Sequence, residues 1–423
     1  MNNPQLADPA LAFNQSTNAP SAQDMDVDQE SYPNTAESIL QAAINLKPLI
    51  RGSRDEMDRE RRLPSHLVDA LKKAGVFRMT MPLTWGGAEL DPVTQLRIIE
   101  VLAEADASVA WCVMVGCDSG FFSGFIDQQV ARKMYTDIDT ITGSALTTTG
   151  RAVKVEGGYR VTGRMPFSSG CRHSEWFVLG CQVYDGEQVN CLPNGIPETR
   201  QCFLPADAVT ILDTWQTTGL QGTGSNDLTV SDHFVPEEQS FSFQNLTFYR
   251  DSPLYRFPMN ILLNFSSVPL GVAQTAIDSL IECGERPARI TVVGDALGSA
   301  RTLREQPFVQ DAVGRAQSQL AAARAYLYTS IGALWSSLQA GEEITPQQFA
   351  DFQLVHTHVF ETCSDVVKLI YKVRGGSAVY QGNELDRCMR DILAMNQHVV
   401  NSLRSYAAGG RVLLGLPPEQ ILL

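Results

Sequence analysis

Apolar residues recur every three or four positions along residues 36–140, and this spacing predicts a helical first region. Near Ile141 the period falls to two. The stretch AVKVEGGYRVTG then predicts two strands joined at Gly157 and Gly158, and further alternating stretches follow it. Residues 141–245 are therefore expected to form an antiparallel sheet module.

Beyond this module the helical spacing returns. Four long apolar-periodic segments predict a four-helix bundle over residues 246–423. The last segment, LDRCMRDILAMNQHVVNSLR, carries His398 on what reads as one buried helix face, with Ile392, Leu393, Met395, Val399 and Val400. The fold class expected from these patterns is mainly α with a central β module.

The first 35 residues differ from the rest of the chain. They contain neither Lys nor Arg and are rich in Asn, Gln, Ser, Pro and Asp, which is typical of a disordered leader and unlike a signal peptide. Since no apolar run approaches the ~20 residues that span a bilayer, no membrane segment is expected.

Charge and cysteine content narrow the possible partners. Lys and Arg number 33 against 47 Asp and Glu, a net charge of −14 that disfavours a nucleic-acid partner. The nine cysteines form no CxxC pair, and free thiols in a reducing cytoplasm are the simplest interpretation. His356 and His358 stand two positions apart, on different faces of a predicted helix, so no metal site is expected.

Five stretches, in order, resemble segments of the acyl-CoA dehydrogenases. MPLTWGGAELD resembles their P-x-x-x-G-G loop, GGYRVTGRMPFSSG their flavin-contact strand, and TGLQGTGSNDLTVSDHFVP a later strand segment. RTLREQPF and VRGGSAVYQGNELDRCMRD resemble their C-terminal flavin-binding segments. The resemblance covers residues 36 to 415. It implies a helical, β and helical order of domains, a bound flavin and a homotetramer.

Two departures from the family pattern point to another reaction. Aligning Arg390 and Asp391 with the family's R-D-x-x-x-x-x-x-Y-E-G-T motif places Val399 where the catalytic glutamate stands, with His398 just before it. No Asp or Glu lies between Asp391 and Glu419, so the usual base for proton abstraction beside a thioester is missing. The family's W-I-T has also become Phe-Ser-Ser, which ends at Ser169.

The Phe-Ser-Ser stretch and the late histidine are similar to features of the two-component flavin monooxygenases, which are built on the same fold. The resemblance implies an oxygenase that takes reduced flavin, FAD or FMN, from a separate NAD(P)H-dependent reductase. It reacts the flavin with O2 to a C4a-hydroperoxide and oxygenates a small aromatic or heteroaromatic substrate, indole-like or phenolic. The alternatives are an acyl-CoA dehydrogenase-type oxidoreductase, an amino-sugar N-oxygenase and a non-catalytic flavin or acyl-carrier binding module.

Two residues are candidates for catalysis. Ser169 matches the family's threonine beside flavin N5, and a hydroxyl both donates and accepts hydrogen bonds. The alternative is that SSG is only a small polar turn. His398 is the candidate for handling a proton of the substrate or for stabilising the peroxide. The alternative is a buried histidine bonded to a backbone carbonyl.

The remaining candidates are carried over from the family by position. The stretch GSALTTTG occupies the place of the family's first flavin strand. Arg301, six residues before Pro307, matches the family's arginine ligand of the flavin phosphate. Gly375 and Gly376 match a glycine pair that lets a neighbouring subunit approach the cofactor. The candidate cofactor contacts are Ser144, Leu146, Thr147, Thr148, Phe167, Ser168, Ser169, Arg301, Gly375 and Gly376. The candidate substrate contacts are Trp111, Cys117, Asp118, Phe121, Trp215 and Tyr380.

Overall fold

The computed structural model describes residues 32–287, 302–401 and 403–417. Nearly all of the leader expected over residues 1–35, and the candidate phosphate ligand Arg301, lie outside the described residues. Residues from Pro33 onward form one compact unit.

The first region is helical, as its apolar spacing predicts. Three of its helices begin at aspartate caps: Asp91 accepts from the Thr94 amide at 3.0 Å, Asp106 from the Ser108 amide at 2.9 Å, and Asp127 from the Gln129 amide at 2.8 Å. The helices are α1 (Ala36–Gly52), α2 (Arg54–Glu60), α3 (Ser65–Lys73), α4 (Pro92–Ala103), α5 (Ala107–Gly116), α6 (Ser119–Phe122) and α7 (Gln128–Met134).

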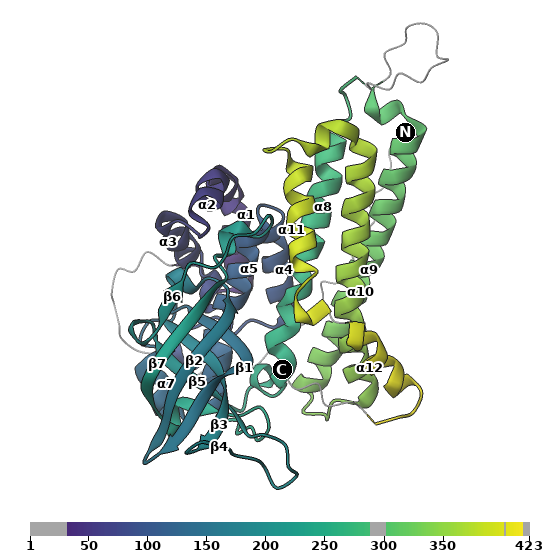
Figure 1. The fold of residues 1–423 in the computed structure, drawn as a ribbon. Coiled ribbons are helices and arrows are strands. Elements are labelled where there is room, and N and C mark those ends of the chain that lie inside the picture. Colours follow the sequence, from purple (N-terminus) through teal and green to yellow (C-terminus); the bar gives the residue numbers. More distant parts are fainter. Residues whose placement is uncertain (1–31, 288–301, 402, 418–423) are drawn as a thin grey trace, which may run out of the picture. The chain divides into compact units, whose positions relative to one another are not determined.

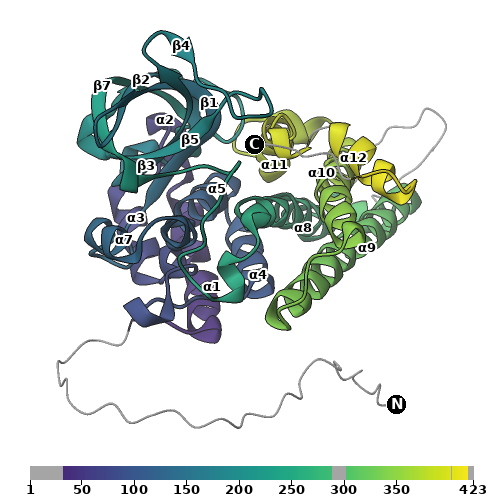
Figure 2. The same ribbon diagram turned by 90° about the horizontal axis from the view of Figure 1, so that it is seen from below.

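The middle region forms one eight-stranded sheet that curls strongly, as Figure 2 shows. The predicted hairpin is confirmed, since β1 and β2 pair antiparallel around Gly157, whose φ is +77°. The strands are β1 (Thr142–Val155), β2 (Gly158–Ser168), β3 (Trp176–Asp185), β4 (Gln188–Val189), β5 (Thr199–Pro205), β6 (Thr210–Leu212), β7 (Asn226–Pro236) and β8 (Ser240–Phe241).

One strand pair corrects the expectation of a purely antiparallel sheet. The order is β6-β7-β2-β1-β3-β5-β8, with β4 beside β3, and β1 pairs with β3 in parallel. After β2 the chain crosses back beside β1, so β3 enters on the opposite edge of β1 in the same direction. The other described pairs are antiparallel.

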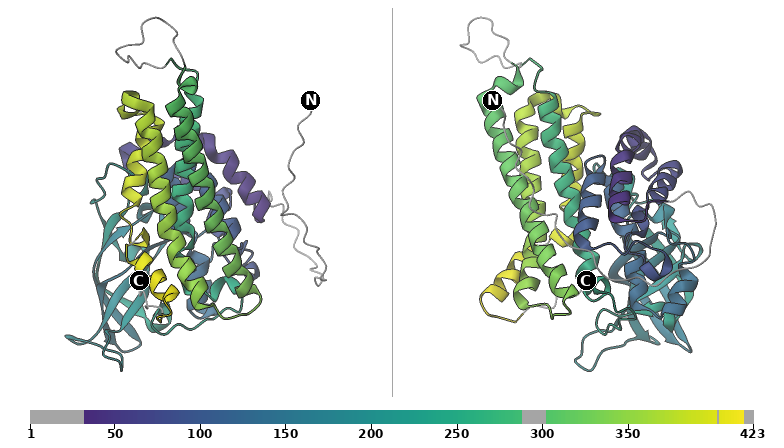
Figure 3. Two further views of the ribbon diagram at one scale, coloured as in Figure 1. Left: turned by 90° about the vertical axis from the view of Figure 1, so that its right-hand side faces the viewer. Right: turned by 180° about the vertical axis from the view of Figure 1, so that it is seen from behind.

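The last region contains long helices that pack side by side, most visibly α9 and α10 in Figure 3. They are α8 (Ser267–Glu282), α9 (Pro307–Gln339), α10 (Pro346–Arg374), α11 (Glu384–Met395) and α12 (Leu403–Leu413). The segment expected to be a single fourth helix is broken. Helix α11 ends at Met395, and a short 3-10 turn, Val399–Asn401, separates it from α12.

Helices of the first and last regions share one hydrophobic core. Helix α4 packs on α8, α5 also contacts α8, and α8 contacts α11, so that α5 lies between the sheet and the bundle (Figure 1). The stretch Ala107–Phe125 is apolar and long enough to cross a membrane by length and composition, but 94% of its most apolar window is buried inside the protein. Its first half, α5, lies in this shared core, whereas Phe121, Phe122 and Phe125 belong to a separate aromatic cluster.

Candidate active site

Trp111 and Ser169, predicted for different roles, meet in one place. Trp111 lies on α5, and Ser169 follows the last residue of β2. The indole Nε1–H of Trp111 donates a hydrogen bond to Ser169 Oγ at 3.1 Å, and both residues are buried. Helix α5 and strand β2 are thus joined at the residue expected to face flavin N5.

His398, in the turn after α11, contacts the Trp111 of this pair. Its ring stacks on Phe265 with 4.5 Å between centroids and meets Trp111 edge-on at 5.3 Å. Phe265 also packs edge-on against Trp111 at 5.3 Å, so three rings form one cluster. The sequence interpretation of a buried helix face is wrong here, because His398 lies in the turn after α11, and Val399 is 67% exposed.

One hydrogen bond of the His398 ring defines its tautomer. Its Nδ1 accepts from the Val400 amide at 3.2 Å, so the neutral ring carries its hydrogen on Nε2. Burial lowers the pKa of His398 to about 4. The ring is therefore a neutral hydrogen-bond donor at neutral pH and a weak base.

Two hydroxyl residues that the sequence analysis missed extend the site behind Ser169. Ser169 Oγ lies 2.7 Å from Ser225 Oγ, which in turn lies 2.7 Å from Thr223 Oγ1. Thr223 Oγ1 donates to the carbonyl of Leu220 at 2.8 Å. Both residues belong to the stretch TGLQGTGSNDL, whose resemblance to a family motif was the available signal.

Phe167 adopts an unusual backbone conformation beside this site. Its φ is +62°, a region that bulky residues rarely occupy, and its side chain is 70% exposed. The pairing of β2 with β7 is irregular here, between Met165 and Ser168. The Phe167 ring stands edge-on to half-buried Trp215, 6.4 Å between centroids. Such strain with an exposed ring is typical of a ligand-contacting position.

Ser168 points away from that surface. It is fully buried, and its hydroxyl has no hydrogen-bond partner among the described residues. It differs in this from the exposed Phe167 just before it, whereas Ser169 after it is buried as well. Its role as a cofactor contact remains a prediction.

The four candidates of the first flavin strand lie on β1. The pairing of β1 with β3 shifts between Ala145 and Gly150, so the strand bulges at this point. The Leu146 carbonyl faces β3 closely, since a Cβ added at Gly180 would lie 2.2 Å from its oxygen. Ser144, Leu146 and Thr148 are half-buried, and Thr147 is exposed. Their contact with a cofactor remains a prediction.

The candidate substrate residues near the end of α5 have different environments. Cys117 is fully buried, donates to the Met114 carbonyl at 3.2 Å and has its pKa raised well above the usual range by burial, so it is an inert thiol. Phe121 packs in a separate aromatic cluster, 4.9 Å from Phe125. Asp118 is 7% exposed, and its carboxyl group bonds to no described residue.

Burial raises the pKa of the Asp118 carboxyl well above its usual range, which favours the neutral acid. Asp118 lies in the turn between α5, which ends at Gly116, and α6, which begins at Ser119.

The remaining candidates lie on the surface between α10 and α11. Gly375, with φ +73°, and Gly376 both face open space, and Tyr380 is 70% exposed. They do not meet the Trp111–Ser169–His398 cluster within this chain. Open glycines at this point leave room for a close approach by another molecule.

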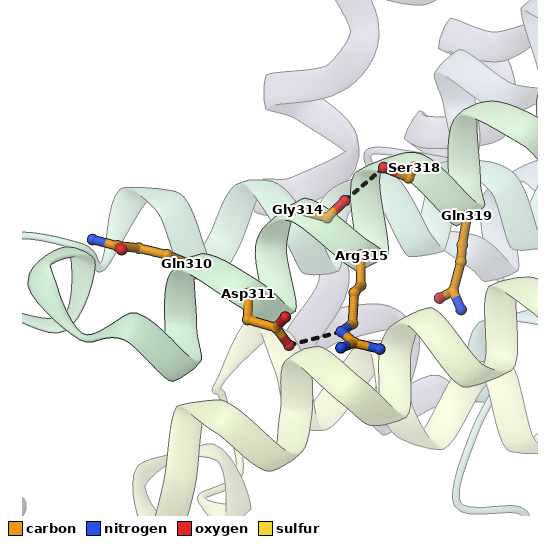
Figure 4. Close-up of a pocket in the computed structure, with 6 residues that line it drawn as sticks. All are labelled: Gln310, Asp311, Gly314, Arg315, Ser318 and Gln319. Carbon is orange, nitrogen blue, oxygen red and sulfur yellow. Dashed lines mark hydrogen bonds and ion pairs between the residues drawn. The ribbon is translucent and has the colours of Figure 1, made fainter.

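The surface hollow drawn in Figure 4 is not part of this site. It encloses about 430 Å³ and is lined only by the outer face of α9: Gln310, Asp311, Gly314, Arg315, Ser318 and Gln319. Asp311 forms a 2.7 Å ion pair with Arg315, and Gln310 donates to the Arg304 carbonyl just before the helix at 2.9 Å. Within the described ranges, no group of three His, Cys, Asp or Glu residues is arranged to hold a metal ion.

Comparison with known families now places the fold. Residues 28–128 match the acyl-CoA dehydrogenase N-terminal domain, and residues 263–403 match the acyl-CoA dehydrogenase C-terminal domain. The chain belongs to the acyl-CoA dehydrogenase superfamily.

Individual members of this superfamily resemble the chain along most of its length. This chain is 29% identical to indole-3-acetate monooxygenase of Pseudomonas putida, and the match covers 90% of this chain and 96% of that protein. It is 28% identical to the flavin-dependent monooxygenase oxygenase subunit HsaA of Rhodococcus jostii, covering 88% and 97%. The crystal structure of 3-HSA hydroxylase from Rhodococcus sp. RHA1 superimposes with a TM-score of 0.82 at 28% identity, covering 90% and 98%.

The site fits a flavin, the cofactor that the acyl-CoA dehydrogenase fold implies. The exposed Phe167 ring and half-buried Trp215 offer apolar surface, and the Nε2–H of His398 offers a neutral donor. By the R-D motif alignment, exposed Val399 stands where the acyl-CoA dehydrogenases carry their glutamate, and the preceding His398 meets Trp111 edge-on.

Proposed function

We propose that the protein is the oxygenase component of a two-component flavin monooxygenase. It would use reduced flavin and O2 to oxygenate a small aromatic or heteroaromatic substrate. One observation carries the proposal: Ser169, Trp111 and His398 converge where a thioester dehydrogenase needs a carboxylate, and the sequence has none between Asp391 and Glu419. The likeness to indole-3-acetate monooxygenase and HsaA supports the same reaction class.

Reduced flavin, when bound, supplies the electrons that activate O2. The chain's own contribution is position, dryness and control of protons. Phe167 and Trp215 would cover the ring system, and Ser169 would present a hydroxyl to it. Since Ser169 Oγ accepts from Trp111 Nε1–H, its orientation is set before any ligand arrives.

His398 would act as a hydrogen-bond donor. Of the two roles expected for it, taking a proton and stabilising a reactive oxygen, its environment favours the second. With a pKa lowered to about 4, the ring holds a proton on Nε2 and takes a second one only in acid. Phe265 and Trp111 flank the half-buried His398 ring on two sides and limit the access of water to it.

The substrate would lie along the α5 face that carries Trp111. The buried carboxyl of Asp118 bonds to no described residue, and burial raises its pKa well above the usual range, so it is suited to hydrogen-bond a heteroatom of an indole-like or phenolic compound. Cys117, Phe121, Trp215 and Tyr380 remain candidate contacts. An amino-sugar N-oxygenase is the alternative within this class.

The partners follow from the two-component scheme. A separate NAD(P)H-dependent reductase would deliver reduced flavin by diffusion, in the cytoplasm. A homotetramer would cover the apolar side chains that this chain leaves exposed near its C-terminal helices, among them Val379 at 59% and Leu414 at 81%. Light scattering coupled to size exclusion measures the assembly directly.

A reductase-coupled screen tests the function. The protein is supplied with FAD or FMN, NADH and a flavin reductase, and then with indole-3-acetate, simple phenols, an amino-sugar nucleotide or an acyl-CoA, and products are followed by mass. A product 16 Da heavier than an aromatic substrate is expected. Anaerobic bleaching of bound flavin by the acyl-CoA, with no O2-dependent product, would overturn the proposal in favour of a dehydrogenase.

A further inference from the structure

The loop before β7 docks tightly onto helix α11. Arg390 Nη1 donates to the Thr218 carbonyl at 2.6 Å, and the Leu220 amide donates to Asp391 Oδ1 at 2.7 Å. Gly219 lies so close that an added Cβ would stand 2.1 Å from the Arg390 carbonyl oxygen. A carboxylate, a guanidinium and a glycine thus fix one loop to one helix.

The docked loop leads directly to Ser169. Leu220 adopts a left-handed conformation with φ +51°, and its carbonyl accepts from Thr223 Oγ1 at 2.8 Å. From there hydroxyl groups continue through Ser225 to Ser169, each 2.7 Å from the next. The chain of contacts runs without a gap from α11 to the end of β2. Because Leu220 is not a glycine, its positive φ is strained, and its hydrogen bonds with Asp391 and Thr223 hold it in place.

Charged groups hold the Asp391 end of this chain. Arg387, one turn earlier on α11, interacts electrostatically with Asp391, and its guanidinium pairs with Asp58 and, at 3.3 Å, with Asp106. Asp106 caps α5, the helix that carries Trp111. Every member of this cluster is mostly buried, so the ion pairs are little screened by salt.

We propose that Asp391 is a positioning residue for Ser169. By accepting the Leu220 N–H it sets the strained turn that orients Thr223 and Ser225, and through them the Ser169 hydroxyl. His398 follows the end of α11 by three residues. Helix α11 therefore helps to position both Ser169 and His398. The inference rests on the proposed function, because the role of Ser169 at a flavin is part of that function.

The first readout needs no flavin. In Asp391→Ala, amide hydrogen exchange of residues 217–225 is expected to rise about tenfold, since the buried Leu220 N–H loses its acceptor. Asp391→Asn, which keeps an acceptor oxygen at the same place, is expected to show a smaller rise. Asp311→Asn, at the solvent-facing ion pair on α9 in Figure 4, is the matched control and leaves the exchange of this loop unchanged.

The second readout separates positioning from general stabilisation. Product formed per O2 consumed is measured in a double-mutant cycle of Asp391→Ala and Ser169→Ala. If Asp391 acts through Ser169, the double variant is expected to be no worse than Ser169→Ala alone. Should Asp391→Ala not fold, Thr223→Val breaks the same chain nearer Ser169, and the cycle is run with it.

Either of two results would overturn the positioning role. One is unchanged exchange of residues 217–225 in Asp391→Ala, or in Asp391→Asn where the alanine variant does not fold. The other is a double variant whose loss of product per O2 equals the product of the losses in the two single variants. If no variant, nor the parent protein, forms an oxygenated product, the proposed function fails, while the exchange measurement still decides whether Asp391 holds the loop.

Discussion

The protonation of His398 gives the sharpest prediction at the level of a single residue. With the pKa lowered to about 4, about 3% of the rings would be protonated at pH 5.5. An ordinary histidine, with a pKa of about 6.5, would be about 90% protonated there. The thirtyfold difference follows from burial of the ring against Phe265 and Trp111.

The assay is an NMR titration of the flavin-free protein labelled with 13C at the histidine Cε1 atoms. Six histidines are present, and the His398 signal is assigned by its absence in His398→Gln. Its chemical shift is expected to stay constant from pH 8 to pH 5.5, whereas an exposed ring shifts near pH 6.5. An inflection of the His398 signal near pH 6.5 would refute the neutral-donor reasoning and restore the role of a proton acceptor.

The remaining predictions concern stability and coupling. The folded pKa values of His398 and His173 (about 4) and of His356 (about 3) lie below the unfolded value of about 6.5, so their stabilisation is present above pH 6.5 and is lost as the pH falls towards 4. Between pH 6.5 and 5, each histidine is expected to lower the free energy of unfolding, measured in urea, by about 1.6 kcal/mol. An unfolding free energy independent of pH in this window would contradict that burial. Ser169→Ala leaves the Trp111 indole N–H without its acceptor and is expected to cost about 1–3 kcal/mol and to lower product formed per O2; full coupling would remove Ser169 from the cofactor site. Phe167→Asn, which tolerates positive φ, is expected to raise the unfolding free energy by about 1 kcal/mol while weakening flavin affinity, and a loss of stability would argue against strain.

The order of the helical, β and helical regions followed from periodicity alone, because a change of period from 3.6 to 2 and back is a local property. The hairpin at Gly157 is such a local feature. The parallel pairing of β1 with β3 is not, since alternation shows which face a strand buries but not which strand lies beside it.

The spacing of apolar residues also failed to predict the helix break before His398. Apolar spacing continues through Val399 and Val400, yet His398 Nδ1 takes the Val400 amide, which a continuing helix would bond to a carbonyl. The resemblance to a family motif found Ser169 and His398, but their meeting with Trp111 joins residues far apart in the chain. No local signal in the sequence marks Phe265, which completes the cluster.

The central claim is that this acyl-CoA dehydrogenase fold transfers oxygen rather than abstracting a carbon-bound proton. The most direct test is one turnover with reduced flavin under 18O2, with the aromatic substrate that the screen identifies, followed by mass spectrometry of the product. One 18O atom in the product is predicted. A product that carries no 18O, or a desaturated thioester formed without O2, would contradict the account.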